Sequence, residues 1–284
     1  MSNQNASLYI VSTPIGNLED ISQRAITVLQ SVELIAAEDT RHSSKLLQHL
    51  SISTPCLALH EHNERDRAAS LIKRLQSGES IALISDAGTP LLSDPGYHMV
   101  KMAHAQGIPV VPVPGASALL AALVSAGLPT DRFVFEGFLP SKQVARQKAL
   151  EKLKNESGTL VFYEAPHRIL STLQDMAICF GDDREAVLAR ELTKTYETVQ
   201  RDSLAGLVNW VEQDSNQQRG EIVLVVAGAA PPDDDALDEE ALRILNILLA
   251  KLSVKQAASL AAEITGQKKN RLYQLALELA DKNS

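Results

Sequence analysis

Residues 8–17 read Leu-Tyr-Ile-Val-Ser-Thr-Pro-Ile-Gly-Asn, a short apolar run that ends in a loop of small residues. The arrangement returns at 80–90, where Ser-Ile-Ala-Leu-Ile-Ser leads into Asp-Ala-Gly-Thr-Pro, and at 108–118, where Ile-Pro-Val-Val-Pro-Val leads into Pro-Gly-Ala-Ser-Ala. Apolar residues at helical spacing follow the loops. A buried strand, a Gly/Pro loop and a helix in succession are typical of βαβ units.

The apolar runs predict two sheets. Strands of the first are expected at 8–12, 33–37, 56–60, 80–85 and 108–113, in one mostly parallel sheet covered on both faces. Strands of the second are expected at 132–136, 159–163, 185–190, 197–201 and 221–227, with helices at 116–126, 143–154, 167–178 and 203–212. The third and fourth of these strands are too close for a helical crossover, which predicts mixed strand directions. We therefore expect a two-lobed α/β fold, with lobes at 1–115 and 116–230.

Three helix starts are predicted from capping residues in the first lobe, one of them at Asn63 before Glu64 and Arg65. Asp20 with Gln23 has the spacing of a capping box. Asp94 before Pro95 has the order of an N-cap and a first helical residue. We expect helices to begin at all three places.

The last quarter of the chain has a different charge pattern. An acidic linker is expected at 231–240 and a helical module at 241–284, with helices at about 239–251, 253–265 and 267–281. Residues 243–273 carry six basic side chains against one acidic side chain, Glu263. Two alternatives are open, namely an RNA-binding module like a helix-turn-helix and a helical appendage for dimerisation or packing.

Composition excludes several classes of protein. The chain has 284 residues, 45% of them hydrophobic, which suits two ordinary cores. It has no apolar run near the roughly 20 residues of a bilayer span and no secretory pattern at Met1, so we expect a cytoplasmic protein. A net charge of -8 argues against nucleic-acid binding by overall charge, and the two distant cysteines do not have zinc-ligand spacing.

The loops after the strands are the candidate ligand site. No dinucleotide fingerprint, no nucleoside-triphosphate loop and no hydrolase elbow is present. Open α/β sheets bind ligands at the carboxyl ends of their strands, and glycine and alanine there let a ligand approach the backbone. We expect a cleft for a flat, polar, modestly charged cofactor, without a metal ion.

Five motifs resemble a known superfamily. They are Val-Ser-Thr-Pro-Ile-Gly-Asn-Leu at 11–18, Ala-Ala-Glu-Asp-Thr-Arg at 36–41, Ser-Asp-Ala-Gly-Thr-Pro at 85–90, Phe-Tyr-Glu-Ala-Pro-His-Arg at 162–168 and Arg-Glu-Leu-Thr-Lys at 190–194. Together they resemble the tetrapyrrole-methylase-like superfamily, and within it the bacterial ribosomal RNA small subunit methyltransferase I family, over about residues 7–284. Corrin and porphyrin methylases usually carry Gly-Asp-Pro where this chain has residues 87–90, which counts against a tetrapyrrole substrate.

The resemblance implies a class III methyltransferase fold and a homodimer. It also implies that S-adenosylmethionine is bound between the lobes, and that a cytidine 2′-hydroxyl is methylated in the decoding region of 16S rRNA, within the 30S ribosomal subunit. The implied cofactor-binding residues are Pro14, Gly16, Asp86, Ala87, Gly88, Thr89, Pro90, Pro114, Ser117, Ala118, Phe162, Tyr163, Glu164, Leu192, Thr193, Gly220, Glu221, Ile222 and Val223.

A ribose hydroxyl is a poor nucleophile until its proton leaves, so charged groups near strand ends are the candidate catalytic residues. We predict Glu38, Asp39 and Lys194. Lys194 could act neutral if burial lowers its pKa, or as a cation, and the alternative is a phosphate contact. Residues 38–41 have an equally simple interpretation as a helix N-cap neutralised by Arg41.

The RNA-binding prediction rests on basic residues. They are Arg41, Arg168, Lys268, Lys269 and Arg271. Two other functions stay open, a small-molecule methyltransferase of the same superfamily and an RNA-binding or regulatory protein without catalysis. The basic module argues against the first.

Overall fold

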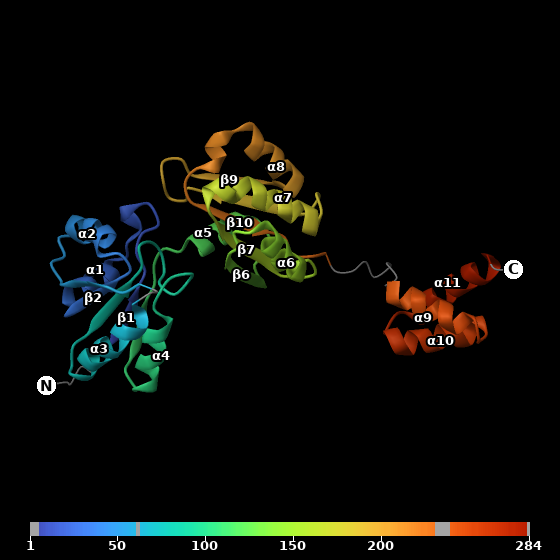
Figure 1. Cartoon of the computed structure of the whole chain (residues 1–284), viewed down its shortest axis with the longest axis horizontal. Helices are drawn as coiled ribbons and strands as arrows, with labels where there is room; N and C mark the ends of the chain where they lie inside the picture. Colours follow the sequence, from blue (N-terminus) through green and yellow to red (C-terminus); the bar gives the residue numbers. More distant parts are fainter. Residues whose placement is uncertain (1–5, 61–62, 231–238, 283–284) are drawn as a thin grey trace. The chain divides into compact units, whose positions relative to one another are not determined.

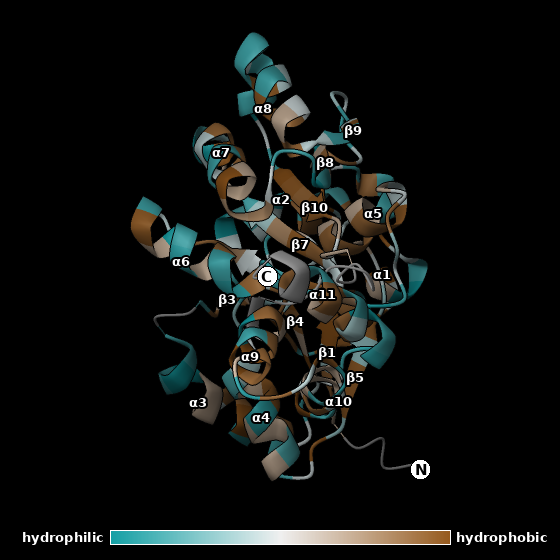
Figure 2. Cartoon of the chain, turned by 90° about the vertical axis from the view of Figure 1, so that its right-hand side faces the viewer, coloured by the Kyte–Doolittle hydropathy of each residue, from teal (hydrophilic) through white to brown (hydrophobic). Residues whose placement is uncertain are grey.

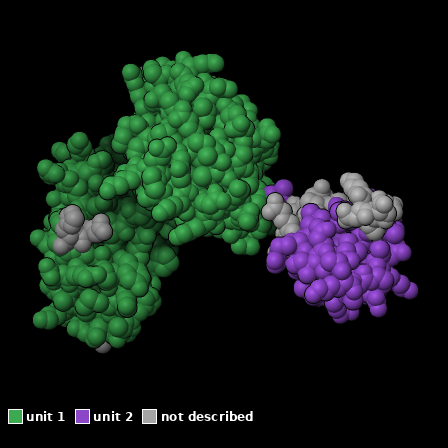
Figure 3. Space-filling view, turned by 45° about the vertical axis from the view of Figure 1, so that its right-hand side comes forward, with its two compact units in different colours: residues 1–229 green, residues 230–284 purple. Residues whose placement is uncertain are grey.

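The computed structural model describes residues 6–60, 63–230 and 239–282. They fall into two compact units, Met1–Ala229 and Ala230–Ser284, which Figure 3 colours green and purple. The predicted acidic linker at 231–240 lies outside the described residues except for its last two, which begin a helix.

The first sheet is parallel throughout. Its strands are β1 (Leu8–Val11), β2 (Leu34–Ala37), β3 (Cys56–Ala58), β4 (Ile81–Ile84) and β5 (Val110–Val113), in the order β3-β2-β4-β1-β5. The lobe is drawn in blue to green in Figure 1, where β1 and β2 are labelled. The helical segments of this lobe are η1 (Leu18–Asp20), α1 (Gln23–Ser31), α2 (Thr40–His49), α3 (Glu64–Gln76) and α4 (Tyr97–Ala105). The five predicted strands and the parallel sheet are confirmed.

Helices cover both faces of this sheet. As a consequence, β2 and β4 are buried at every position. One cluster packs Leu29 of α1 and Leu47 of α2 against one face. Another packs Leu71 of α3 and Met99 of α4 against the other face. Strands buried on both faces read as continuous apolar runs, which is why the sequence located them.

Two predicted helix starts in this lobe are wrong. Ser22, and not Asp20, caps α1 by accepting a hydrogen bond from the Ala25 amide. The fourth helix begins after Gly96, so Asp94 is not its N-cap. The loop before α4 is thus longer than the sequence suggested, and Asp94 belongs to it.

The second sheet mixes strand directions, as predicted. It comprises β6 (Phe133–Phe138), β7 (Thr159–Glu164), β8 (Glu185–Arg190), β9 (Thr198–Ser203) and β10 (Ile222–Val226), in the order β6-β7-β10-β8-β9. Only the pair β6 and β7 is parallel. The helical segments are α5 (Ala118–Ser125), α6 (Gln143–Leu153), η2 (Pro166–Arg168), α7 (Ile169–Phe180), α8 (Leu204–Gln213) and η3 (Ser215–Gln218).

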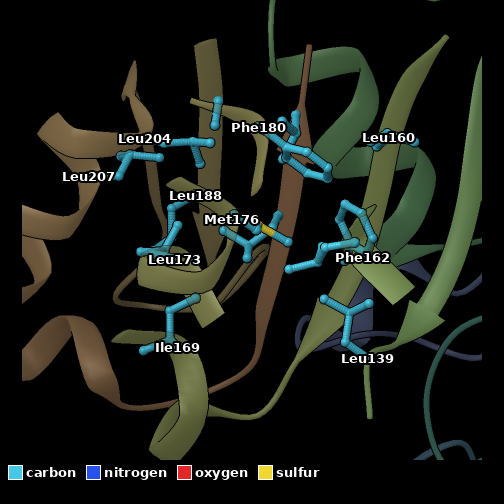
Figure 4. Packing of buried hydrophobic residues seen from close by; sticks show 14 of the residues in the cluster. Leu139, Leu160, Phe162, Ile169, Leu173, Met176, Phe180, Leu188, Leu204 and Leu207 are labelled. Atoms are coloured by element: carbon cyan, nitrogen blue, oxygen red, sulfur yellow. The ribbon is translucent and has the colours of Figure 1, made fainter. Parts of the chain in front are cut away.

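Each face of the second sheet has its own core. Helices α6, α7 and α8 cover one face, where Phe162 of β7 and Met176 of α7 belong to one cluster (Figure 4). Helix α5 covers the other face, through Leu119 and Leu123. The strands β1 and β10 are brown in Figure 2, the colour of hydrophobic residues, as expected of strands inside a layered fold.

The cluster under α5 also joins the lobes. Ile15, from the loop after β1, is 7% exposed and packs there with Leu119 and Leu192 of the second lobe. Leu92, from the loop after β4, packs against the same cluster. The two sheets are therefore held together by apolar contacts at the loops that follow β1 and β4.

The second unit is a three-helix module with its own small core. Helices α9 (Glu239–Leu249), α10 (Val254–Thr265) and α11 (Lys269–Lys282) surround alanine and leucine side chains such as Leu245, Ala258 and Leu272. Ser253 and Gln256 form a capping box at the start of α10, and Gly266 ends it with a φ of 71°. In the part of the chain that the structure describes, no helix is both long and apolar enough to cross a membrane.

A buried ion pair in the second lobe generates a stability prediction. The Nε of Arg146 donates to an Asp175 carboxylate oxygen at 2.6 Å, and Gln143 and Gln147 donate to the other oxygen. Asp175→Ala leaves the Arg146 charge buried, so the free energy of unfolding should fall by about 3–5 kcal/mol in urea denaturation. Arg146→Met combined with Asp175→Leu should recover most of this. A loss below about 1 kcal/mol in Asp175→Ala would contradict the argument.

Candidate active site

A cavity of about 420 Å³ lies between the two lobes of the first unit. The volume is within the range of sites for small organic ligands. The lining residues are Ile15, Glu38, Asp86, Ala87, Gly88, Thr89, Leu92, Ser93, Asp94, Ala118, Phe138, Tyr163, Glu164, Ala165, Pro166, Ala189, Leu192, Gly220, Glu221, Ile222 and Val223.

On the first-lobe side, three small-residue loops form one layer. Thr13 and Gly88 exchange two backbone hydrogen bonds, at 2.8 and 3.0 Å. The Ser12 and Thr89 hydroxyls are 2.8 Å apart, and Thr89 donates to the Ala116 carbonyl oxygen at 3.0 Å. The loops after β1, β4 and β5 are therefore tied together before any ligand binds.

The same side of the cavity carries three carboxylates. Asp86 accepts a hydrogen bond from the Asp39 amide at 3.0 Å, and its own amide donates to Glu38 at 3.4 Å. Burial raises the pKa of Glu38, and the negative charges of Asp86 and Asp39 add to the effect. Burial, followed by the charge of Glu38, raises the pKa of Asp94 to about 6. Among the described residues, no lysine or arginine forms an ion pair with Glu38, Asp86 or Asp94.

On the second-lobe side, aromatic rings stand beside a neutralised carboxylate. The Tyr163 ring packs edge-on against Phe135 and Phe138, with centroid distances of 4.9 and 5.6 Å. Glu164 is 3% exposed and accepts hydrogen bonds from Arg168 at 3.0 Å and Thr172 at 2.6 Å. This wall combines ring surface with a carboxylate whose charge is already balanced.

Arg168, predicted to bind RNA, has an internal role in the structure. Its Nη2 donates to the Leu139 carbonyl oxygen at 2.7 Å and to Glu164. Its side chain is largely buried. The guanidinium group holds the loop after β7 in place. Little of its surface is therefore accessible to a phosphate.

Lys194 is a cation that holds the second-lobe wall. Its Nζ lies 2.8 Å from a Glu191 oxygen and 3.1 Å from a Glu221 oxygen. Partial burial would lower the pKa of Lys194, but the hydrogen bonds to Glu191 and Glu221 prevail and raise it. The structure therefore favours the cationic alternative for Lys194. Glu191 and Thr193 have positive φ angles of 51° and 66°, so this loop is strained.

Asp39 and Arg41 form a helix cap at the edge of the cavity. Asp39 accepts a hydrogen bond from the Arg41 amide at 2.8 Å and pairs with the guanidinium at 3.0 Å. The hydrogen bond from the Arg41 side chain lowers the pKa of Asp39 to about 2. The helix-cap interpretation of 38–41 thus describes Asp39, whereas Glu38 lines the cavity.

Most of the predicted cofactor residues lie on the cavity wall. Those that line it are Asp86, Ala87, Gly88, Thr89, Ala118, Tyr163, Glu164, Leu192, Gly220, Glu221, Ile222 and Val223. Those outside the lining are Pro14, Gly16, Pro90, Pro114, Ser117, Phe162 and Thr193. The Phe162 side chain lies in the core under α7, on the other face of β7. The basic residues Lys268, Lys269 and Arg271 belong to the second unit, at the start of α11.

Sequence reasoning missed several lining residues, of which Asp94 and Phe138 carry the most chemistry. Asp94 was interpreted as a helix cap. The signal that could have found it is the Pro95-Gly96 pair directly after it, since such pairs mark turns. Phe138 gave no signal, because a β-bulge between Phe135 and Gly137 decides where it points.

Two buried hydroxyls next to the lining have no hydrogen-bond partner among the described residues. They are the Ser117 Oγ, before Ala118, and the Thr193 Oγ1, after Leu192. Buried polar groups are nearly always satisfied, so an unsatisfied pair at a cavity points to a ligand with polar groups. Within the described ranges, no three His, Cys, Asp or Glu side chains are grouped as metal ligands would be.

Comparison with known proteins identifies the family. The family "Tetrapyrrole (Corrin/Porphyrin) Methylases" matches residues 7–208, and "RsmI C-terminal HTH domain" matches residues 235–280. A protein of Pseudomonas aeruginosa named ribosomal RNA small subunit methyltransferase I is 59% identical, covering 98% of this chain and 99% of that protein. A protein of the same name from Escherichia coli O157:H7 is 54% identical over 97% and 96% of the two chains. This chain belongs to that family.

Solved structures of low identity share the fold of the first unit. Diphthine synthase has a TM-score of 0.58 at 17% identity, covering 78% of this chain and 90% of that one. Cobalt precorrin-4 methyltransferase has a TM-score of 0.56 at 14% identity, covering 80% and 97%. Uroporphyrin-III C-methyl transferase from Thermus thermophilus, complexed with S-adenyl homocysteine, has a TM-score of 0.53 at 16% identity, covering 78% and 97%. The predicted two-lobed fold with a helical C-terminal module is confirmed.

The contact between Gly16 and the loop at 191–194 generates the second prediction. A Cβ on Gly16 would overlap the Lys194 side chain and lie 2.9 Å from the Thr193 hydroxyl. Gly16→Ala should therefore push the lobes apart at this point and lower the melting temperature by several degrees. In a Lys194→Ala background, Gly16→Ala should lower the melting temperature clearly less, because the overlapping Lys194 side chain is absent. Equal costs in both backgrounds, measured as a double-mutant cycle, would contradict the contact.

Proposed function

We propose that this chain transfers a methyl group from S-adenosylmethionine to the 2′-hydroxyl of a cytidine in the decoding region of 16S rRNA. Family membership supports the coarser statement, a methyltransferase that acts on small-subunit ribosomal RNA. The observation that carries the proposal is the near-complete match to relatives of that name at 59 and 54% identity, across both units. The cavity supplies independent chemical support.

The cavity suits a cationic, polar methyl donor. S-adenosylmethionine supplies a methyl group that is already activated by a positively charged sulfur. Glu38 and Asp86 make the first-lobe wall acidic, which favours a cation over a neutral or anionic ligand. The cofactor-binding residues proposed are Asp86, Ala87, Gly88, Thr89, Ala118, Tyr163, Glu164, Leu192, Gly220, Glu221, Ile222 and Val223, with Pro14, Gly16, Pro90 and Pro114 shaping the loops behind them.

In-line methyl transfer depends mainly on positioning. Of the three predicted catalytic residues, Glu38 is the one that lines the cavity. Asp39 holds the Asp86 carboxylate through its backbone amide, and Lys194 holds Glu221. Asp39 and Lys194 therefore act as positioning residues, and neither is proposed to take a proton.

The second unit is proposed to bring the RNA. Lys268, Lys269 and Arg271 lie where α10 turns into α11, in a module whose family is described as a helix-turn-helix domain. A chain of net charge -8 holds naked RNA poorly, so the proposed substrate is the assembled 30S particle, which offers shape as well as phosphate. Exposed Arg41, beside the cavity, is a further candidate for a phosphate contact.

We further propose that the protein acts in the cytoplasm as a homodimer, as the family resemblance implies. Light scattering at micromolar concentration measures the mass directly. A mass of 30.8 kDa at all concentrations would reject the dimer.

The third prediction concerns the donor site. Gly88 has a φ of 79°, and a Cβ there would lie 3.3 Å from Ile15, at the cavity wall. Gly88→Val should reduce S-adenosylmethionine affinity at least about tenfold in calorimetry, roughly 1.4 kcal/mol. Gly78→Val is the matched control, since Gly78 also has a positive φ but has no atom within 4 Å of an added Cβ. Equal S-adenosylmethionine affinity of the two variants would show that the donor does not bind in this cavity.

The fourth prediction concerns the second unit. Truncation after Ala229 should leave donor affinity nearly unchanged, because every lining residue lies in the first unit. Methylation of 30S particles from cells lacking the enzyme should fall by more than about tenfold, as measured by mass spectrometry of digested 16S rRNA. Lys268→Glu with Lys269→Glu should give a milder loss that deepens with salt. A full rate in the truncated protein would make the module a packing appendage.

A further inference from the structure

The loop between β4 and α4 is strained in a way that directs one carboxylate into the cavity. Leu91 and Ser93 have φ angles of 73° and 69°, a region that residues with a Cβ rarely adopt, and Gly96 has a φ of 128°. Asp94 lies between these positions and lines the cavity. Strain of this kind costs free energy and persists where the surrounding structure enforces it, typically at functional sites.

The second lobe enforces this conformation through a bulge in β6. Gly137 has a φ of 64°, and a Cβ there would lie 2.9 Å from the Ser93 hydroxyl. The register of β6 against β7 shifts between Phe135 and Gly137. The loop that carries Asp94 and the bulge that precedes Phe138 therefore meet at the contact of Ser93 with Gly137.

The bulge is followed by an exposed aromatic ring that lines the same cavity as this carboxylate. Phe138 is 57% exposed and lines the cavity, and its ring lies 5.6 Å from the Tyr163 ring. An exposed ring supported from behind by a second ring is a suitable platform for a base that has been taken out of its stack. The ring and Asp94 belong to opposite lobes but to one cavity.

We propose that Phe138 and Asp94 form the subsite for the acceptor nucleoside. The base stacks on the Phe138 ring, and the ribose 2′-hydroxyl donates a hydrogen bond to the Asp94 carboxylate. The 2′-oxygen forms its bond to the methyl carbon as the carbon–sulfur bond breaks, with the electron pair left on sulfur. The hydroxyl proton passes to Asp94 and then to solvent. This inference rests on the proposed function and names the base that it needs.

Asp94 is better placed for this task than its acidic neighbours. Glu38 and Asp86 each accept a hydrogen bond from a backbone amide, which ties them to the loop framework. The hydrogen bond that lowers the pKa of Asp94 comes from the Ser85 side chain, and burial outweighs it. A carboxylate with a raised pKa is a stronger base and is still ionised at neutral pH.

The pH dependence follows from the groups that face Asp94. In the first lobe these are Glu38 and Asp86, whose negative charges both raise its pKa. From the second lobe, the titratable groups on the wall are Tyr163, Glu164 and Glu221. With a pKa of about 6, Asp94 loses its function as a base as the pH falls through 6. The transfer rate should therefore rise up to pH 6 and level off above it.

The fifth prediction tests Asp94 with 30S particles that lack the modification. Asp94→Asn should lower the single-turnover transfer rate about 100-fold or more, with donor affinity unchanged within about threefold, and should abolish the rise in rate around pH 6. Asp131→Asn, at an exposed position before β6, is the matched control and should change neither rate nor profile. A variant that keeps both the rate and the pH step would overturn the assignment of Asp94.

Phe138 is tested by the same assay. Phe138→Ala should raise the KM for the particle about tenfold without changing donor affinity, and Phe138→Trp should restore it, because stacking needs a ring. Phe133→Ala removes another exposed ring of β6 that is absent from the cavity lining, and should behave as wild type. An unchanged KM in Phe138→Ala, or a loss equal in both alanine variants, would overturn the stacking platform.

The reaction of the wild-type protein distinguishes failure of the proposed function from failure of the acceptor subsite. If the wild-type protein does not methylate a cytidine 2′-hydroxyl of 16S rRNA in these particles, both the proposed function and the subsite fall. If it does, while Asp94→Asn and Phe138→Ala match their controls, the function stands and the subsite alone is rejected.

Discussion

The apolar contact of Ile15 with Leu119 and Leu192 is the constraint on which the site depends. It sets the separation of two sheets that each have a complete core of their own. Next to it, Gly16 passes so close to Lys194 and Thr193 that a single methyl group would not fit. The cavity is the space left beside this contact, bounded by the loops that the contact holds in place.

The distribution of charge around that space is asymmetric. On the second-lobe side, Glu164 is paired with Arg168, and Glu191 and Glu221 share Lys194. On the first-lobe side, Glu38, Asp86 and Asp94 have no such pairing among the described residues, and burial raises the pKa of Glu38 and of Asp94. Unbalanced carboxylates inside a cleft are costly to a free protein. This free-energy cost is explained by the proposed function, in which a cationic donor binds beside these carboxylates and one of them accepts the hydroxyl proton.

The two units differ in the physical properties that the proposed function requires. The first unit concentrates strain and desolvated charge in a small cavity, which suits a compact donor and one nucleoside. The second unit is a small three-helix module with basic residues at one turn, which suits contacts to phosphates over a larger surface. A net charge of -8 over the whole chain makes such a local basic surface necessary for any RNA substrate.

The sequence by itself determined the ten strands, the parallel and mixed sheets and the acidic and glycine-rich loops, because buried strands and strand-end loops leave local patterns. It also placed Glu38, Asp86 and Gly88 at the site through the five motifs. Only the tertiary structure decided the roles of Asp94, Phe138, Lys194 and Arg168. Their roles depend on a β-bulge, a strained loop, the ion pair of Lys194 with Glu221 and the hydrogen bond of Arg168 to Leu139, and such contacts leave no periodic signal in the chain.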